Sequence, residues 1–165
     1  MPVSFKRSFV AWTIREKGGG FKGEHQPSDA IVATTTPDAK NRQILPDGAT
    51  QLVDTRLHGI VLLGGDLPQP ALLSLTVTQI KKSKRWMTYM QEQQVKDNLP
   101  TFAHIYKLST VPEKNDQGNW MGWKVDPAGD VTDQEQIDAA LALYQALQSG
   151  QARMRADLAD PNQEA

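Results

Sequence analysis

The sequence predicts a mainly β protein of the α+β class, with a single domain over residues 1–150. Segments rich in β-branched and aromatic residues recur between turns that contain glycine and proline, and two stretches show helical spacing of apolar side chains. The chain of 165 residues is 39% hydrophobic and 22% charged, which is enough for a sizeable core. No apolar run reaches the roughly 20 residues of a membrane span, so we expect no membrane partner.

The first strand is expected over residues 3–15, VSFKRSFVAWTIR, because its apolar and aromatic residues lie too close together for one helical stripe. It ends at the triplet Gly18–Gly20. A long loop with three prolines follows over residues 18–50, and its short apolar piece 30–35 is a candidate strand. Loops of this length in a compact domain are usually functional or mobile.

The second strand is expected over residues 51–63, where side chains alternate with a period of two. This alternation predicts one buried face and one face, with Asp54, Arg56 and His58, that is wet or faces a ligand. Residues 71–79 form the third strand. The β-branched residues then stop and helical spacing begins, which predicts a helix over residues 80–94.

Strands four and five are expected over residues 102–111 and 119–125, joined as a hairpin by PEKNDQG. Thr132 and Glu135 fit a capping box, with the Thr132 hydroxyl accepting the Glu135 amide, so a C-terminal helix is expected over residues 132–149. Residues 151–165 contain few apolar side chains and are expected to form a frayed, mildly acidic tail. Five strands with a helix between strands three and four follow the order of a five-stranded OB-like barrel.

Charge is distributed unevenly along the chain. Residues 1–124 hold 16 of the 18 Lys and Arg but 11 of the 19 Asp and Glu, and ten of the eleven aromatic residues. A basic, aromatic-rich body joined to an acidic end is a pattern to test against polyanion binding. The chain has no cysteine, which excludes disulfides, thiolate metal sites and a cysteine nucleophile. Without a signal-peptide layout at the N-terminus, we expect a cytoplasmic protein.

The most specific local feature is a run of four cations in five residues: Lys81, Lys82, Lys84 and Arg85. Such a run creates a positive field that suits phosphates. Trp86 follows at once and could stack on a base, although inward packing of its ring is the more common outcome. We therefore list Trp86 with the cations as a candidate nucleic-acid ligand, with both alternatives open.

The predicted hairpin carries a second set of candidates. Trp120 and Trp123 are three residues apart, so on a strand they point to opposite faces, one expected in the core and one facing a ligand. On strand four, Phe102, His104 and Tyr106 share one face, a candidate stacking platform, while Ala103 and Ile105 on the other face are expected in the core. Lys107 adds a cation beside Tyr106.

Weaker candidates lie on strand two and in the glycine-rich segment. Arg56 and His58 could contact a bound strand, and Phe21 and Lys22 in GGGFKG could close over it, or this segment could be a plain hairpin connection. A metal-dependent nuclease would recruit Asp54 and His58. The three histidines show no metal-ligand spacing, and Arg56 between these residues opposes a cation, so we expect no metal and no cofactor.

The layout of residues 3–147, together with GGGFKGEH, LVDTR-x-H, TQIKKSKRW and TVPEKNDQGNWMGWK, resembles the phage-encoded OB-fold single-stranded DNA-binding proteins of the T7-like replication type. The resemblance implies an OB barrel that binds single strands through cations and aromatic residues. It also implies an acidic tail that occupies the groove or recruits replication partners; here the tail lacks the terminal aromatic residue of that type. Its binding roles fall on Lys81, Lys82, Lys84, Arg85, Tyr106 and Trp120.

The sequence thus predicts a non-enzymatic, sequence-independent single-stranded DNA-binding protein, in the host cytoplasm if phage-encoded, that protects strands in replication or recombination. Replication or recombination proteins and further copies of the chain are expected partners. Two alternatives stay open: a metal-dependent nuclease using Asp54, His58 and a third carboxylate, and a virion or assembly module whose exposed aromatic residues contact other proteins.

Overall fold

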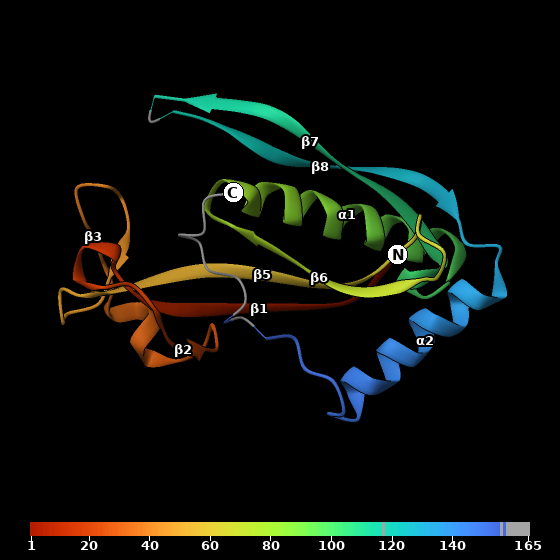
Figure 1. The fold of residues 1–165 in the computed structure, drawn as a ribbon, viewed down its shortest axis with the longest axis horizontal. Coiled ribbons are helices and arrows are strands. Elements are labelled where there is room, and N and C mark those ends of the chain that lie inside the picture. Colours follow the sequence, from red (N-terminus) through yellow and green to blue (C-terminus); the bar gives the residue numbers. More distant parts are fainter. Residues whose placement is uncertain (117, 156, 158–165) are drawn as a thin grey trace. The chain divides into compact units, whose positions relative to one another are not determined.

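A computed structural model describes residues 1–116, 118–155 and 157 of the chain (Figure 1). The protein is mainly β, with two α-helices and short 3-10 turns. The strands are β1 (Pro2–Thr13), β2 (Phe21–His25), β3 (Thr36–Pro37), β4 (Gln43–Ile44), β5 (Thr50–Leu62), β6 (Gln69–Thr76), β7 (His104–Asn115) and β8 (Gly118–Asp130). The helices are α1 (Ile80–Asp97) and α2 (Gln134–Gln148).

The strands form two sheets, both open. The larger sheet has the order β2-β1-β5-β4-β3, with β6 also paired to β5, and β7 and β8 form a separate two-stranded ribbon. The five long strands and both helices expected from the sequence are therefore confirmed, as is the helix between the third and fourth of these strands. The closed OB-like barrel is not confirmed, because β7 and β8 pair only with each other among the described strands.

The described chain divides into two compact units. The first comprises Met1–Phe5, His58–Leu73 and Thr78–Arg153. The second comprises Lys6–Leu57 and Ser74–Val77, with residues 154, 155 and 157. A single domain over residues 1–150 stays a prediction, and most of the expected tail at 151–165 lies outside the described residues.

The first unit contains α1, α2 and the ribbon, and β7 and β8 run alongside α1 (Figure 1). Its apolar core joins the start of β1 and the end of β5 to α2, through Met1, Val3, Val61 and Ala140. Phe102 and Ile105 are partly buried and pack against this cluster. This packing holds the base of the ribbon, because Ile105 belongs to β7.

The second unit holds the β1–β2 hairpin and the segment expected to be a long loop. That segment contains β2, β3 and β4, so it is more structured than predicted. The candidate strand at 30–35 is wrong: Ala30–Thr34 is a 3-10 turn, closed by a 2.8 Å bond from Thr34 Oγ1 to the Ile31 carbonyl. Ile31 and Val32 pack against a core of Ala11, Leu45 and Leu52. The turn lets these two neighbouring side chains contact the same core.

The start of α2 differs from the expected capping box. Thr132 is not the N-cap; Asp133 is, and its Oδ1 accepts the Glu135 amide at 2.8 Å. A carboxylate is an effective cap because it satisfies one of the free amides of the first turn and complements the positive end of the helix dipole. The helix therefore begins at Gln134, two residues later than the sequence indicated.

Candidate nucleic-acid interface

The basic run forms the first turns of α1. Lys81, Lys84 and Arg85 are exposed, and Lys82 is half-buried. The opposite face of the helix is buried through Ser83, Trp86 and Met90. Helical spacing separates the two sets, because residues three and four apart share a face. The charged side chains therefore project away from the packed face, as a surface for phosphates requires.

This clustering is electrostatically unfavourable for the helix itself. The first turn of α1 contains no acidic residue, and its N-cap, Gln79, makes no side-chain capping bond. Cations near a helix N-terminus oppose the helix dipole. Arg85 is steadied by Tyr89, one turn later: its Nε donates to the Tyr89 hydroxyl at 2.6 Å, and its guanidinium lies 5.3 Å from the ring centre.

The ribbon places the two tryptophans on opposite faces, as the spacing predicts. Trp120 pairs with Glu113 and Trp123 pairs with Thr110, three positions apart in an antiparallel register. Both tryptophans are half-buried, so neither is a full core residue. The opposite faces are therefore as predicted, but neither tryptophan is in the core, because both side chains are partly exposed.

The buried side of the ribbon changes along its length. Near the base, Tyr106 and Val125 are buried, whereas near the tip Gly122 is buried, and Gly122 lies on the other face of the register. Two-stranded ribbons twist more strongly than wider sheets, and this twist turns one face and then the other toward a neighbour. The sequence could not show this change. Alternation along a strand indicates which residues share a face, but it does not indicate how strongly the ribbon twists.

Three side-chain contacts join the tip of the ribbon to the start of α1. Lys82 Nζ lies 2.6 Å from Glu113 Oε1, and Gln79 Nε2 lies 3.3 Å from Glu113 Oε2. Gln79 Oε1 accepts the backbone amide of Trp123 at 2.9 Å. On the ribbon itself, Trp120 Nε1 donates to Glu113 Oε2 at 3.0 Å. Glu113 thus holds the Trp120 ring next to Lys82, whereas Trp123 is joined to the start of α1 only through its backbone amide.

Glu113 and Gln79 are the site residues that sequence reasoning missed. The ammonium group of Lys82 is the main cause that lowers the pKa of the Glu113 carboxyl, and the bonds from Trp120 and Gln79 act in the same direction. The predicted hairpin placed Glu113 in its turn, whereas β7 continues to Asn115 and pairs Glu113 with Trp120. Nothing in the sequence pairs Gln79 with the hairpin, because that contact depends on tertiary packing.

Trp86 is buried, with 2% of its surface exposed, so inward packing is the observed alternative and its ring offers no face to a bound strand. It stacks on His58 at 4.5 Å and meets the edge of Tyr106 at 5.8 Å. The expectation that His58 faces solvent or a ligand is wrong: His58 is fully buried, with Nε2 2.8 Å from Ser83 Oγ. The aromatic stack explains why a polar ring occupies the apolar layer between β5 and α1.

The predicted stacking platform on strand four is also wrong. Phe102 lies in a 3-10 turn, and both His104 and Tyr106 are buried. His104 sits between two carboxylates, with Nδ1 2.9 Å from Asp130 and Nε2 3.3 Å from Asp97. The side chains expected on a wet face are therefore committed to packing, because α1 covers the base of β7.

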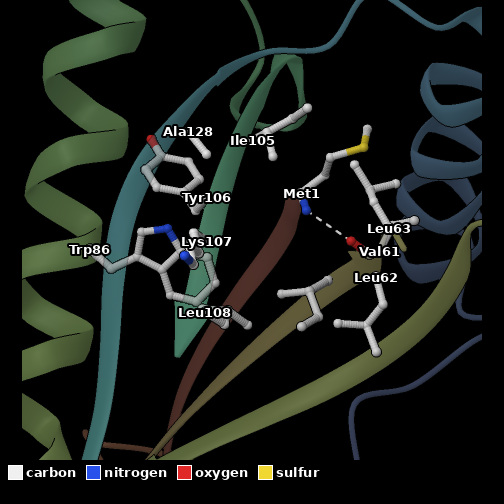
Figure 2. Close-up of a pocket in the computed structure, with 11 residues that line it drawn as sticks. Met1, Val61, Leu62, Leu63, Trp86, Ile105, Tyr106, Lys107, Leu108 and Ala128 are labelled. Carbon is white, nitrogen blue, oxygen red and sulfur yellow. Dashed lines mark hydrogen bonds between the residues drawn. The ribbon is translucent and has the colours of Figure 1, made fainter. Parts of the chain in front are cut away.

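Tyr106 and Trp86 line one side of a pocket of about 460 Å³, and the end of β5 and Met1 line the other side (Figure 2). The walls are mostly apolar. Tyr106 Oη and Trp86 Nε1 have no hydrogen-bond partner among the described residues, and burial raises the pKa of the Tyr106 hydroxyl. Lys107 also lines this pocket and is exposed, so its charge remains available at the surface.

The remaining candidates belong to the second unit. Arg56 is mostly buried, and its Nε lies 3.8 Å from Asp54 Oδ1. Arg7 forms a bidentate pair with the same carboxylate, with hydrogen bonds of 3.0 and 2.8 Å. Asp54 is therefore paired with two nearby bases. Since its carboxylate is neutralised by two guanidinium groups, it is poorly suited to hold a divalent cation.

Phe21 and Lys22 lie on β2, after the three glycines with positive φ that turn the β1–β2 hairpin. Phe21 is exposed on one side and packs edge-on against Trp12 at 5.6 Å. Lys22 Nζ donates to Thr50 Oγ1 at 2.8 Å and lies 3.5 Å from Asp47. A hairpin connection is therefore the observed alternative for this segment.

Two further features of the described residues bear on function. No group of three or more His, Asp or Glu side chains in residues 1–116, 118–155 and 157 is arranged to hold a metal ion. No helix in this part of the chain is long and apolar enough to cross a membrane.

Comparison with known proteins places this mainly β chain in a class of phage proteins. A family model described as Pam3 phage gp34-like protein matches residues 1–153. The chain belongs to this Pam3 phage gp34-like family, since the match covers most of its length. No curated protein and no solved structure matches the chain.

Proposed function

We propose that this phage-family protein binds single-stranded DNA without reading its sequence and protects exposed strands during replication or recombination. The observation that carries the proposal is the contact of the ribbon tip with the start of α1. Glu113 links the Trp120 indole to Lys82 of the basic run, and Gln79 links the backbone of Trp123 to the start of α1. Cations next to aromatic rings are the combination that single-strand binders use.

The exposed cations would supply the sequence-independent part of the affinity. Lys81, Lys84 and Arg85 project from one side of α1, and Lys107 is exposed on β7. Phosphate contacts by such side chains release counterions, so binding should weaken steeply as salt rises, with a slope of about 0.7 per contact in log–log form. A flexible single strand can follow cations spread over a helix and a ribbon more easily than a stiff duplex can.

The aromatic part of the site would come from the ribbon rather than from Trp86. The Trp123 side chain lies on the opposite face of the ribbon from Glu113. It is half-buried, so part of its ring surface is accessible. Its exposed strand neighbour Met121 extends the same face with apolar surface. Stacking of a base on such a ring contributes about 1–3 kcal/mol in known single-strand complexes.

The arrangement of charge at α1 also supports binding. A helix that begins with lysines and lacks an acidic first turn gives up some of its own stability. Local costs of this kind are common where a residue is kept for a task other than folding. The proposal involves binding without catalysis, and it does not depend on a closed OB-like barrel, because α1 and the ribbon supply the surface.

Tryptophan fluorescence during titration with an oligo-dT of about 30 nucleotides tests the proposal. Trp12 and Trp86 are buried, so we expect quenching to come from Trp120 and Trp123. Quenching should be strong at low salt, weaker at moderate salt, and small with the matching duplex. Replacing Trp123 by Phe should remove much of the signal and reduce affinity.

The basic run is tested by the triple variant K81A/K84A/R85A. Its affinity should fall and its salt slope should flatten by about two, the sum expected for three lost phosphate contacts. The matched control is K17A/K96A/R153A, which removes the same charge from exposed positions elsewhere in the chain. Equal losses in both variants would show that only net charge matters, and the proposed interface would then be abandoned.

A flat titration at low salt would contradict the proposal. Stable oligomers that ignore DNA would then favour the virion or assembly alternative, in which the aromatic ribbon contacts other proteins. Magnesium-dependent cleavage abolished by Asp54→Ala would favour the nuclease, although the pairing of Asp54 with Arg7 argues against it.

A further inference from the structure

One carboxylate occupies the middle of the candidate interface. Glu113 accepts hydrogen bonds from Trp120 Nε1 at 3.0 Å and Gln79 Nε2 at 3.3 Å, and lies 2.6 Å from Lys82 Nζ. These three donors come from two elements, α1 with its N-cap and the ribbon. Together they form a cradle for an oxyanion, and the protein's own side chain fills it.

Gly122 provides the space for this arrangement. A Cβ atom at Gly122 would collide with the carboxylate of Glu113. The backbone of Gly122 does not have a positive φ, so the position does not require glycine for conformational reasons. The absence of a side chain is needed here for one evident purpose, which is to let the Glu113 carboxylate fold across the ribbon toward Lys82.

Lys82 differs from its neighbours for the same reason. Lys81, Lys84 and Arg85 are exposed, and no described acidic side chain is paired with any of them, whereas Lys82 is half-buried and neutralised by Glu113. Ammonium, amide and indole N–H groups donate equally well to a carboxylate and to a phosphate oxygen. The cradle therefore has the donor chemistry of a phosphate site.

We infer that Lys82, Gln79 and Trp120 form a phosphate subsite of the interface, which Glu113 fills in the unbound protein and a backbone phosphate of the bound strand takes over. This inference rests on the proposed function, since it names how one phosphate of the strand is held. Glu113 competes with the strand and lowers its affinity. The exchange replaces the two contacts that Glu113 makes with α1, while the bond from the Trp123 amide to Gln79 Oε1 keeps the ribbon tip at the helix.

Exchange of one anion for another has a measurable signature. In the wild-type protein, the phosphate that reaches Lys82 replaces the Glu113 carboxylate. The charge of Lys82 is already neutralised before binding, so this contact adds little to the salt dependence of the affinity. In Glu113→Gln the same phosphate meets an uncompensated ammonium group, so we expect the salt slope to steepen by about 0.7. At about 0.1 M salt this corresponds to roughly fivefold tighter binding of oligo-dT.

Two variants and one control test the inference. E113Q keeps the shape of the side chain and its acceptor for Trp120 while removing the charge. Gly122→Ala displaces the carboxylate sterically and leaves the net charge unchanged, so it should also tighten binding. The control, Glu92→Gln, removes one exposed acidic charge from α1, ten residues along the helix from Lys82 and so about 15 Å away. It should change the affinity much less.

The outcomes separate this inference from the proposed function. If wild-type protein binds oligo-dT but E113Q binds no more tightly than E92Q, the phosphate subsite is wrong and the proposed function stands. If oligo-dT does not bind at all, titration of E113Q with inorganic pyrophosphate decides. A saturable shift of the Trp120 indole N–H resonance, absent in a K82A/E113Q variant, supports the subsite, and no shift overturns it.

Discussion

The two helices of this protein begin in opposite ways. Helix α2 starts with Asp133 as its N-cap and Glu135 in its first turn, so its free amides meet a nearby carboxylate and its dipole meets negative charge. Helix α1 starts with Gln79, which caps nothing, and then with Lys81 and Lys82. The negative charge at that end comes from Glu113, 31 residues further along the chain.

The difference shows where each helix obtains its stability. The start of α2 is stabilised locally, and Ala140 is its only fully buried residue. The start of α1 is unfavourable by itself, and α1 depends on a buried face of Ser83, Trp86 and Met90 and on the ribbon. A helix held by tertiary contacts can carry a cluster of cations, whereas a helix held mainly by its cap and dipole cannot do so without loss.

The largest effect should come from the packed face of α1. Trp86→Ala removes a ring that is buried between His58 and Tyr106, so we expect the free energy of unfolding to fall by about 3–5 kcal/mol. Tyr144→Ala on α2 removes a half-exposed ring against Phe102 and should lower it by about 1 kcal/mol. Urea denaturation followed by far-UV circular dichroism measures both, and equal losses would contradict the comparison.

The cap of α2 should give the next largest effect. Asp133→Ala leaves the Glu135 amide without its acceptor, and we expect a loss of about 1 kcal/mol in the free energy of unfolding. Thr132→Ala should leave stability nearly unchanged, although the sequence pattern favours Thr132 as the cap. A larger loss for the threonine variant than for the aspartate variant would show that the capping box forms after all.

Reversing the charge at each helix start should have smaller effects of opposite sign. Lys81→Glu places an acidic side chain in the first turn of α1 and should raise the free energy of unfolding by about 0.3–1 kcal/mol. Glu135→Lys in α2 should lower it by a similar amount. The same Lys81 variant should bind oligo-dT more weakly. Thermal unfolding at low and high salt checks this prediction, because screening should reduce both changes.

The smallest effect concerns the pH dependence of the Glu113 contact. Lys82 lowers the pKa of Glu113, so the folded state holds this carboxyl ionised more strongly than the unfolded chain does. The contact therefore adds stability at pH values above the unfolded pKa of about 4.3, and this stability is lost as the pH falls through the lower folded value.

Glu113→Gln should accordingly be less stable than the wild-type protein at pH 7, and the difference should shrink toward zero below about pH 4. Urea unfolding at pH 7, 5 and 3 measures the difference directly. A difference that stays constant with pH would mean that the ion pair does not contribute and that only the neutral hydrogen bonds of the side chain matter.

Much of the secondary structure could be predicted from local patterns. Alternation over residues 51–63 predicted β5, and the change from β-branched residues to helical spacing predicted α1. The β7–β8 hairpin was also predicted, but its turn was placed too early, because β7 continues to Asn115. The short strands β2, β3 and β4 within the expected loop were not predicted, and the candidate strand at 30–35 was wrong. Its apolar residues suit a strand or a turn equally well, and its packing on Leu45 and Leu52 decided for a turn.

The candidate site was predicted only in part. Lys81, Lys84 and Arg85 of the basic run are exposed, whereas Lys82 is half-buried and paired with Glu113. His58, Trp86 and Tyr106 looked like a wet or stacking surface in the sequence, yet they form one buried aromatic cluster. An aromatic side chain has the same sequence pattern whether it packs inward or binds a ligand, so only the covering element distinguishes the two.

The sequence by itself determined the five long strands, the two helices and the spacing that puts Trp120 and Trp123 on opposite faces, since these follow from local backbone periodicity. The tertiary structure alone decided that Glu113 and Gln79 join the ribbon to α1, and that the strands leave open sheets. Those outcomes depend on ribbon twist and on contacts between residues more than 30 positions apart. Local sequence patterns cannot predict such contacts, because these contacts form, and stabilise the protein, only when the folded chain brings distant residues together.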